Sequence, residues 1–255
     1  MCLINFQFHE HPYYKLIVAA NRDEFYNRPT ASAHFWNDEP TILAGRDLEQ
    51  MGTWLGITKQ GRFAALTNYR NPAHMASGKT TRGEIITNYL TETSSPWDFI
   101  ATIHENKVSY NGFNLILGNP DQLVYYNNID GNTVDIPPGT HGLSNHFLNT
   151  PWPKVTKGKE MLHNYVIKHE VIQVDKLFAI LSNEEVAEDV NLPETGIDLE
   201  LERQLSPLFI KTEQYGTRCS TVLLIDHENN LTFLERTFNN GLFIKEKKFE
   251  FQIIE

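Results

Sequence analysis

The 255-residue sequence predicts an α/β (α+β) fold in which two sheets of mainly antiparallel strands are covered by helices. Two observations support this prediction: pairs of short apolar runs flank tight polar turns, and segments with helical spacing separate these pairs. Because sheets and amphipathic helices each bury an apolar face, such elements pack in layers. No repeat, low-complexity tract or linker interrupts the chain, so we expect one domain spanning residues 1–255.

Four hairpins and a terminal strand account for the expected strands. Each hairpin pairs two apolar, β-leaning runs across a turn that contains Gly, Pro or Asn. The first hairpin starts at Cys2, so this residue is expected to begin a strand. The hairpins pair residues 2–8 with 15–20, 53–58 with 62–68, 113–118 with 123–127, and 221–226 with 231–238; residues 248–254 form the terminal strand.

Helical spacing is clearest at residues 81–90, where apolar residues recur on one face after a capping pattern of Thr81 and Glu84. The other segments are interpreted from weaker periodicity and from turn residues. Loops at 26–44 and 69–80 are expected to shape substrate selection. Further helices are expected at 96–106, 152–169, 175–182 and 198–205, and the acidic stretch 184–199 is expected to be a solvated loop.

The composition and the charge exclude several classes of protein. The formal net charge of −10 repels nucleic acid and anionic membranes, although a local cationic pocket is compatible with it. No apolar run approaches the roughly 18 residues of a membrane span, and the first residues lack a secretory pattern. The two cysteines have no metal-binding spacing. We therefore expect a cytoplasmic protein in a reducing compartment, without a metal or other cofactor.

Cys2 is the sharpest candidate for chemistry, because removal of Met1 would expose a thiol and an α-amine on one residue. Reference pKa values are near 8.5 for the thiol and about 7.7–8.0 for the amine, so the amine can activate the thiol as a base. Cys2 also fits the usual role of a free cysteine, a small apolar residue in a buried strand. Its position alone favours that second interpretation, so neighbouring motifs must decide.

Polar residues after or at the end of apolar strands supply candidate partners for Cys2. Arg22 could hold a thiolate or a substrate carboxylate, while Asp23 or Glu24 could orient the α-amine. Asn68 and Asn145 carry amides, which are neutral donors suited to an oxyanion. The charged residues fit a surface loop equally well, and the asparagines fit turns.

Two arginines near the C-terminus are candidate substrate-binding residues. Arg218 precedes the strand expected at 221–226, and Arg236 lies inside the apolar strand expected at 231–238. A strand arginine usually faces water, but it can instead point into a cleft and pair with a carboxylate or phosphate.

Taken together, these motifs resemble the NRDE-motif family, also called the transport and Golgi organisation 2 family. The resemblance covers residues 2–221 and rests on the whole set, since no single motif is specific. The motifs are Met-Cys at the start, NRDEF at 21–25, GRD at 45–47, GTWLG at 52–56, LTNYR at 66–70, GLSN at 142–145, and GTR at 216–218 with Ser220 and Thr221.

The resemblance implies a distant similarity to cholylglycine hydrolases and penicillin V acylases. These are N-terminal-nucleophile hydrolases whose fold is a four-layer αββα sandwich. The similarity implies that Cys2 is the nucleophile, Arg22 the strand-end arginine and Asn145 the oxyanion asparagine. Asn68 matches a second residue near the oxyanion site, and Arg236 resembles a late-strand arginine.

One position departs from the pattern of those hydrolases. They place an aspartate three residues after the arginine, just before an aromatic residue. Here Asp23 follows Arg22 at once, and Glu24 precedes Phe25. Both carboxylates therefore stay open as the group that orients the N-terminus.

The sequence thus predicts a hydrolase or acyltransferase that forms a Cys2 acyl-enzyme from a small-molecule amide or related acyl group that is not a peptide. The family's link to haem handling and to acyl-coenzyme A metabolism supports an alternative, a non-catalytic carrier for haem or an acyl-coenzyme A-like anion. A metal hydrolase built on His9 and His11 has less support, because their spacing is too compact for a helix-borne zinc motif.

Overall fold

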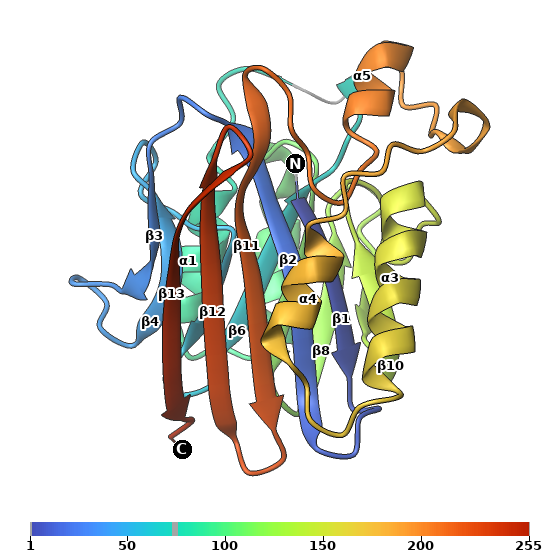
Figure 1. Cartoon of the computed structure of the whole chain (residues 1–255). Coiled ribbons are helices and arrows are strands. Elements are labelled where there is room, and N and C mark those ends of the chain that lie inside the picture. The colour runs from blue at the N-terminus through green and yellow to red at the C-terminus, as the bar shows by residue number, and fades with distance from the viewer. Residues whose placement is uncertain (1, 73–75, 255) are drawn as a thin grey trace.

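Two antiparallel sheets form the centre of the protein in the computed structural model, which describes residues 2–72 and 76–254 (Figure 1). In spatial order, the described strands of the six-stranded sheet are β10 (Gly139–Leu143), β1 (Cys2–Phe8), β2 (Tyr14–Phe25), β11 (Tyr215–Asp226), β12 (Asn230–Asn239) and β13 (Leu242–Gln252). Those of the seven-stranded sheet are β3 (Thr30–Phe35), β4 (Ile42–Asp47), β5 (Leu55–Thr58), β6 (Phe63–Asn68), β7 (Phe113–Asn119), β8 (Gln122–Asn127) and β9 (Thr133–Asp135).

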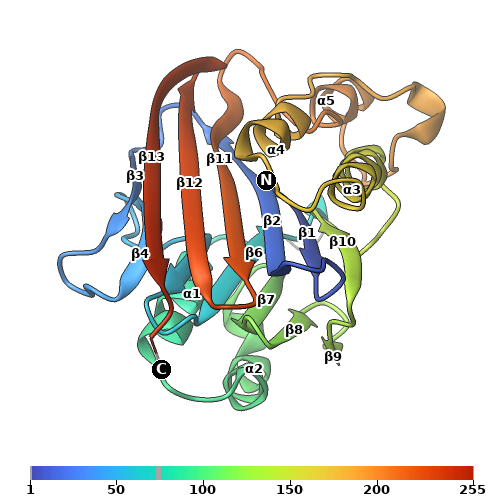
Figure 2. The ribbon, with the colours of Figure 1, turned by 60° about the horizontal axis from the view of Figure 1, so that its bottom comes forward.

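Helices cover the outer face of each sheet, as Figure 2 shows. α3 (Pro153–Val166) packs on β1 and β10, and α4 (Val174–Leu181) packs on β2 and β11. α1 (Gly83–Thr91) packs on β5 and β6, and α2 (Pro96–Glu105) packs on β8. The predicted four-layer αββα sandwich is therefore confirmed. α5 (Leu199–Gln204) and the short 3-10 helices Lys107–Ser109 and Asp189–Asn191 lie in the connections.

Three apolar layers hold the sandwich together, one between the sheets and one under each pair of helices. β1 contributes to two of them, because successive side chains of a strand point to opposite faces. Leu3 packs under the helices, while Cys2, Ile4 and Phe6 face the other sheet. Every residue of β1 is buried, so the strand is covered on both faces. No helix among the described residues is long and apolar enough to cross a membrane.

The predicted hairpins are confirmed, but several strands are longer than the apolar runs suggested. β2 continues through residues 21–25 and β11 begins at residue 215, so the polar motifs there lie within strands rather than beyond them. β13 begins at residue 242 rather than 248. Pairing with a neighbouring strand overrides the weak β propensity of Asn, Asp and Gly at these positions.

The sequence pattern did not predict four of the described strands. β3 and β4 lie within residues 26–44 and just beyond, where loops were expected, because β3 is only partly buried and shows no clear alternation. β9 and β10 are short and contain Gly or Asp, which depress β propensity. The expected capping box is also wrong: Arg82, not Thr81, precedes α1, and its side chain makes no capping bond. Residues 73–75 of the expected loop 69–80 lie outside the described residues.

Gly158 lets α3 approach β1 closely, and this contact generates a prediction. A Cβ at residue 158 would stand 2.5 Å from Nδ2 of Asn5, whose side chain is fully buried on β1. We expect Gly158→Ala to lower the free energy of unfolding by about 1–3 kcal/mol, although Ala favours the helix itself. Urea unfolding measures the change. Thr156→Ala, on the exposed side of α3, should change stability by less than about 0.5 kcal/mol.

Candidate functional site

The register of the six-stranded sheet places Cys2 in a row of side chains that face the other sheet. Cys2 on β1 pairs with Arg22 on β2, Arg22 with Cys219 on β11, and Cys219 with Thr237 on β12. Directly paired residues of an antiparallel sheet project to the same face. All four line a cavity of about 400 Å³. Sheet pairing, rather than a flexible loop, therefore sets where the thiol lies.

The opposite wall of the cavity comes from segments distant in the chain, namely β3, β4, β6 and the loops before β5 and α1. Gly52 lies against Gly83 so closely that a Cβ on Gly52 would be 2.5 Å from the Gly83 carbonyl carbon. The Thr53 N–H donates to the Gly83 carbonyl at 3.3 Å. These contacts fix the start of α1 at the rim of the cavity.

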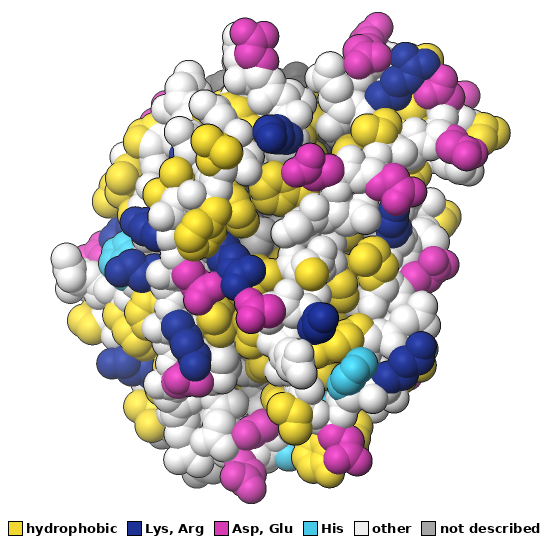
Figure 3. Space-filling view, in the orientation of Figure 1, with side chains coloured by type: hydrophobic (Ala, Val, Ile, Leu, Met, Phe, Trp, Pro, Cys, Tyr) yellow, Lys and Arg dark blue, Asp and Glu magenta, His cyan; other side chains and the backbone are white. Residues whose placement is uncertain are grey.

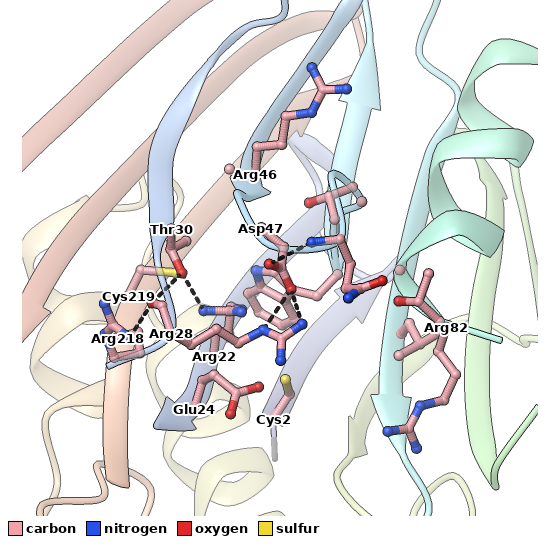
Figure 4. A pocket seen from close by; sticks show the side chains of 18 of the residues that line it. Cys2, Arg22, Glu24, Arg28, Thr30, Arg46, Asp47, Arg82, Arg218 and Cys219 are labelled. Carbon is pink, nitrogen blue, oxygen red and sulfur yellow. Dashed lines mark hydrogen bonds and ion pairs between the residues drawn. The ribbon is translucent and has the colours of Figure 1, made fainter. Parts of the chain in front are cut away.

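The Cys2 side chain points into the cavity, as Figure 4 shows, and is 9% exposed. Burial raises the pKa of the Cys2 thiol, and the charge of Arg22 together with the backbone N–H of Asp23 opposes that rise. Ser144 donates to the Cys2 carbonyl at 3.0 Å and so fixes the backbone. Removal of Met1, which the predicted chemistry requires, concerns a residue outside those described.

The two candidate carboxylates differ in their surroundings. Asp23 is buried, accepts a hydrogen bond from Thr217 Oγ1 at 2.8 Å, and couples electrostatically to Cys2. Burial raises the pKa of Asp23, and the charge of Lys154 opposes that rise. Glu24 is partly exposed at the cavity, and its carboxylate accepts a bond from the Phe25 N–H at 2.9 Å. Of the two carboxylates, Asp23 is therefore the buried one and the one that couples to Cys2.

Lys154, in the first turn of α3, is a buried cation that sequence reasoning missed. It is 2% exposed, and its Nζ has no hydrogen-bond partner among the described residues. Burial lowers the pKa of Lys154 to about 8, while the charges of Asp23 and Cys2 oppose that shift. Beside it, Arg70 and Glu202 form a buried ion pair at 2.5 Å. A buried lysine coupled to other buried ionisable groups beside a cavity is typical of a functional site.

Asn68 and Asn145, the two asparagines expected at the oxyanion site, lie together but have different surroundings. Asn68 lines the cavity. Asn145 is fully buried behind it, where its Nδ2 donates to the Asn68 carbonyl at 2.8 Å and its Oδ1 accepts from Ser144 at 3.1 Å. The Asn145 amide is thus already engaged, and it positions the backbone of Asn68.

The two C-terminal arginines lie on opposite faces of the sheet. Arg218 lines the cavity because a bulge between Thr217 and Cys219 leaves it as the extra residue of β11. The expectation for Arg236 is wrong, since this residue lies in the neighbouring row that faces the helices. Arg236 forms ion pairs with Asp175 at 2.5 Å and Glu246 at 2.7 Å.

This outer face, seen in Figure 3, carries basic and acidic side chains next to one another rather than a patch of one sign. The Arg236 guanidinium also stacks over the Phe178 ring of α4 at 4.0 Å. The residue that β12 presents to the cavity is the preceding one, Glu235, which is buried and accepts a hydrogen bond from the Ala33 N–H at 2.7 Å.

The histidines considered for a metal site are engaged elsewhere. His9 Nε2 lies 2.8 Å from the Pro120 carbonyl, and His11 Nε2 lies 2.9 Å from the His169 carbonyl. Among the described residues, no group of three or more His, Cys, Asp or Glu side chains is arranged to hold a metal ion.

Comparison with known proteins places the chain in a family. Residues 1–240 match the family model described as Transport and Golgi organisation 2. The chain belongs to this family. Its relatives include the Transport and Golgi organization protein 2 homologs of Bos taurus (37% identical over 261 residues) and Homo sapiens (37% over 259 residues), each match covering 93% of both chains. The Drosophila melanogaster protein is 29% identical over 264 residues, covering 93% of this chain and 92% of that one.

The fold of this family member is that of N-terminal-nucleophile hydrolases. Two structures of variants of the conjugated bile acid hydrolase from Clostridium perfringens match it with TM-scores of 0.56 and 0.55. The matches cover 99% of this chain and 98% and 97% of those chains, at 10% sequence identity in both cases. Identity this low establishes a shared fold only.

The cavity is also lined by three arginines that the sequence did not identify as site residues, namely Arg28, Arg46 and Arg82. Arg28 pairs with Asp47 at 2.7 Å, and Arg46 binds both carboxylate oxygens of Asp38 at 2.6 and 2.7 Å. The GRD motif at residues 45–47 was the only signal in the sequence for this group. No pattern in the sequence marked Arg82 as a site residue, because polar residues commonly precede a helix.

The placement of Lys154 predicts that its charge assists ionisation of Cys2. With a pKa of about 8, Lys154 is mainly protonated at pH 7 and favours the thiolate. We expect Lys154→Met to raise the pH midpoint of Cys2 alkylation and to slow alkylation at pH 7 about threefold to tenfold. Rates measured against pH by mass spectrometry test this. Lys157→Met, on the same helix but paired with Glu185, serves as the control; equal midpoints in all three folded proteins would contradict the assignment.

Proposed function

We propose that the protein is an N-terminal-cysteine hydrolase or acyltransferase acting on a non-peptide amide or related acyl group. The observation that carries this proposal is the Cys2 thiol, which begins β1 and points into a cavity within an N-terminal-nucleophile hydrolase fold. The charge of Arg22 and the backbone N–H of Asp23 oppose the effect of burial on the pKa of the thiol, whereas the charge of the Asp23 carboxylate adds to it. Both cysteines are free, which suits the reducing, cytoplasmic compartment that we propose.

The reaction begins once Met1 has been removed. The α-amine of Cys2, oriented by Asp23, takes the thiol proton, and the thiolate attacks the substrate carbonyl carbon. Asn68, held from behind by Asn145, donates to the oxyanion. The carbon–nitrogen bond then breaks, and the α-amine returns the proton to the leaving nitrogen. Water or another acceptor attacks the thioester, and cleavage of the carbon–sulfur bond restores the thiol.

The lining of the cavity favours a polar substrate. Its charged side chains outnumber its large apolar ones, Trp54 and Leu66. The Clostridium perfringens enzyme is by name a hydrolase of conjugated bile acids. A steroid needs an extended apolar surface, because an apolar ligand gains free energy in proportion to the apolar area that it buries. We therefore propose for this chain a smaller and more polar acyl compound.

A second candidate function is carriage of an anionic ligand such as haem or an acyl-coenzyme A-like molecule. The observation that favours it is the excess of arginine over carboxylate in the cavity of a protein with net charge −10. No histidine lines the cavity among the described residues, and two cysteines do, Cys2 and Cys219. Burial and Glu235 disfavour the Cys219 thiolate more strongly, so a haem iron there would take Cys2 as its ligand.

A direct test of catalysis combines intact mass with labelling of the native protein. We expect a mass lower by one methionine residue and a single adduct with a thiol-directed acylating reagent. The adduct should form on wild type and on Cys219→Ala but not on Cys2→Ala, because Cys219 is more strongly disfavoured as a thiolate by burial and Glu235. Retention of Met1, or an adduct that survives Cys2→Ala, would overturn the catalytic proposal.

A haem titration separates the second candidate from the first. A carrier that uses this cavity should shift the Soret band at stoichiometric protein, and Cys2→Ala should abolish the shift. No shift in wild type removes the haem version of that candidate.

A further inference from the structure

The cavity carries more positive charge than its own carboxylates neutralise. Asp47 already pairs with Arg28, and Arg46 is paired outside the cavity with Asp38. Arg22, Arg82 and Arg218 form no ion pair with any carboxylate among the described residues. The cations that line the cavity are Arg22, Arg28, Arg46, Lys79, Arg82 and Arg218, and the acids are Asp23, Glu24, Asp47 and Glu235.

The remaining carboxylates cannot balance three arginines. Glu235 is buried, burial raises its pKa, and it is hydrogen-bonded to the backbone of β3. Asp23 is buried, accepts a hydrogen bond from Thr217, and its charge is coupled to that of Lys154. Glu24 alone shares the open part of the cavity, so it can neutralise one arginine. The cavity therefore offers unneutralised cations to an anionic group on a ligand.

Arg82 stands out among the three because it lies on the wall opposite Cys2, as Figure 4 shows. Its Nη1 donates to the Gly112 carbonyl at 3.0 Å, and its other N–H groups have no hydrogen-bond partner among the described residues. The side chain is partly buried, and burial lowers the pKa of Arg82 while the charges of Cys2 and Glu24 oppose that shift. A partly desolvated guanidinium with free donors is suited to a bidentate anion.

The position of Arg82 is fixed before any ligand arrives. Arg82 immediately precedes α1, and the next residue, Gly83, lies against Gly52 and accepts a hydrogen bond from Thr53. Binding therefore costs little ordering of the backbone, which is what preorganisation contributes to affinity.

We propose that Arg82 forms an anion subsite opposite Cys2, which binds a carboxylate or phosphate carried by the acyl substrate close to its scissile bond. This inference rests on the acyl-transfer function proposed above, and it narrows the substrate class to anionic acylated small molecules. Arg22 and Arg218 lie on the same wall as Cys2, so they add to the attractive field without occupying the opposite position.

Two alkylating reagents that differ in charge test the subsite. Iodoacetate carries a carboxylate, whereas iodoacetamide is neutral, and both alkylate the same thiolate. The ratio of their rates at Cys2 cancels any change in the pKa of the thiol. We expect Arg82→Gln to lower the iodoacetate-to-iodoacetamide rate ratio about tenfold. Arg82→Lys keeps the positive charge but loses the paired N–H donors of the guanidinium, so it should lower the ratio less. Arg236→Gln removes the same charge on the opposite face of the sheet, outside the cavity, and should leave the ratio unchanged.

A second measurement does not depend on the reactivity of Cys2. The unfolding temperature of Cys2→Ala should rise in sodium phosphate or sodium acetate relative to sodium chloride at equal ionic strength, because a bound anion stabilises the folded state. This rise should be smaller in the double variant that combines Cys2→Ala with Arg82→Gln. The anion that raises the unfolding temperature more, phosphate or acetate, indicates whether the subsite prefers a phosphate or a carboxylate.

The outcomes separate the subsite from the reaction. If neither reagent alkylates Cys2 but the anion-dependent rise requires Arg82, the proposed reaction fails and the subsite stands. If Arg82→Gln changes neither the ratio of alkylation rates nor the anion-dependent rise in unfolding temperature, the subsite is overturned. This conclusion does not depend on whether Cys2 catalyses acyl transfer.

Discussion

The site depends on burial of β1 on both of its faces. Leu3 packs under α3 and α4, while Ile4 and Phe6 fill the space between the sheets, so the strand cannot rotate or shift by one residue without exposing one of these sets. Register with β2 then sets Cys2 opposite Arg22. Apolar packing over the whole strand thus fixes Cys2, the first residue of β1, at the edge of a cavity.

The same alternation separates two electrostatic environments. Toward the helices lies a buried set that contains Lys154 and the Arg70–Glu202 pair, and Asp23 lies between this set and the cavity. Toward the second sheet lies the arginine-rich cavity. Burying charges costs free energy unless partners compensate, so ionisable groups gathered on both sides of one strand end are hard to explain by stability alone. Groups from both sets couple electrostatically to Cys2 at this end of the sheet.

A shared fold does not determine a shared substrate in this architecture. The sandwich fixes where Cys2 lies, whereas the opposite wall is built by β3, β4 and the segment before α1. In this chain that wall supplies arginines in preference to a broad apolar surface. The scaffold and the ligand chemistry therefore rest on different parts of the sequence, as is general for folds that host many functions.

The sequence by itself determined the hairpins, most of the helices, the nucleophile candidate and the motifs at residues 21–25 and 216–218, because these depend on local periodicity and on short spacings. Only the tertiary structure decided which side chains meet. A bulge turned Arg218 inward, the register turned Arg236 outward, and close packing on Gly52 brought Arg82 opposite Cys2. Lys154 could not be found from the sequence, since nothing local distinguishes a lysine in the first turn of a surface helix from one that a sheet and a neighbouring helix enclose.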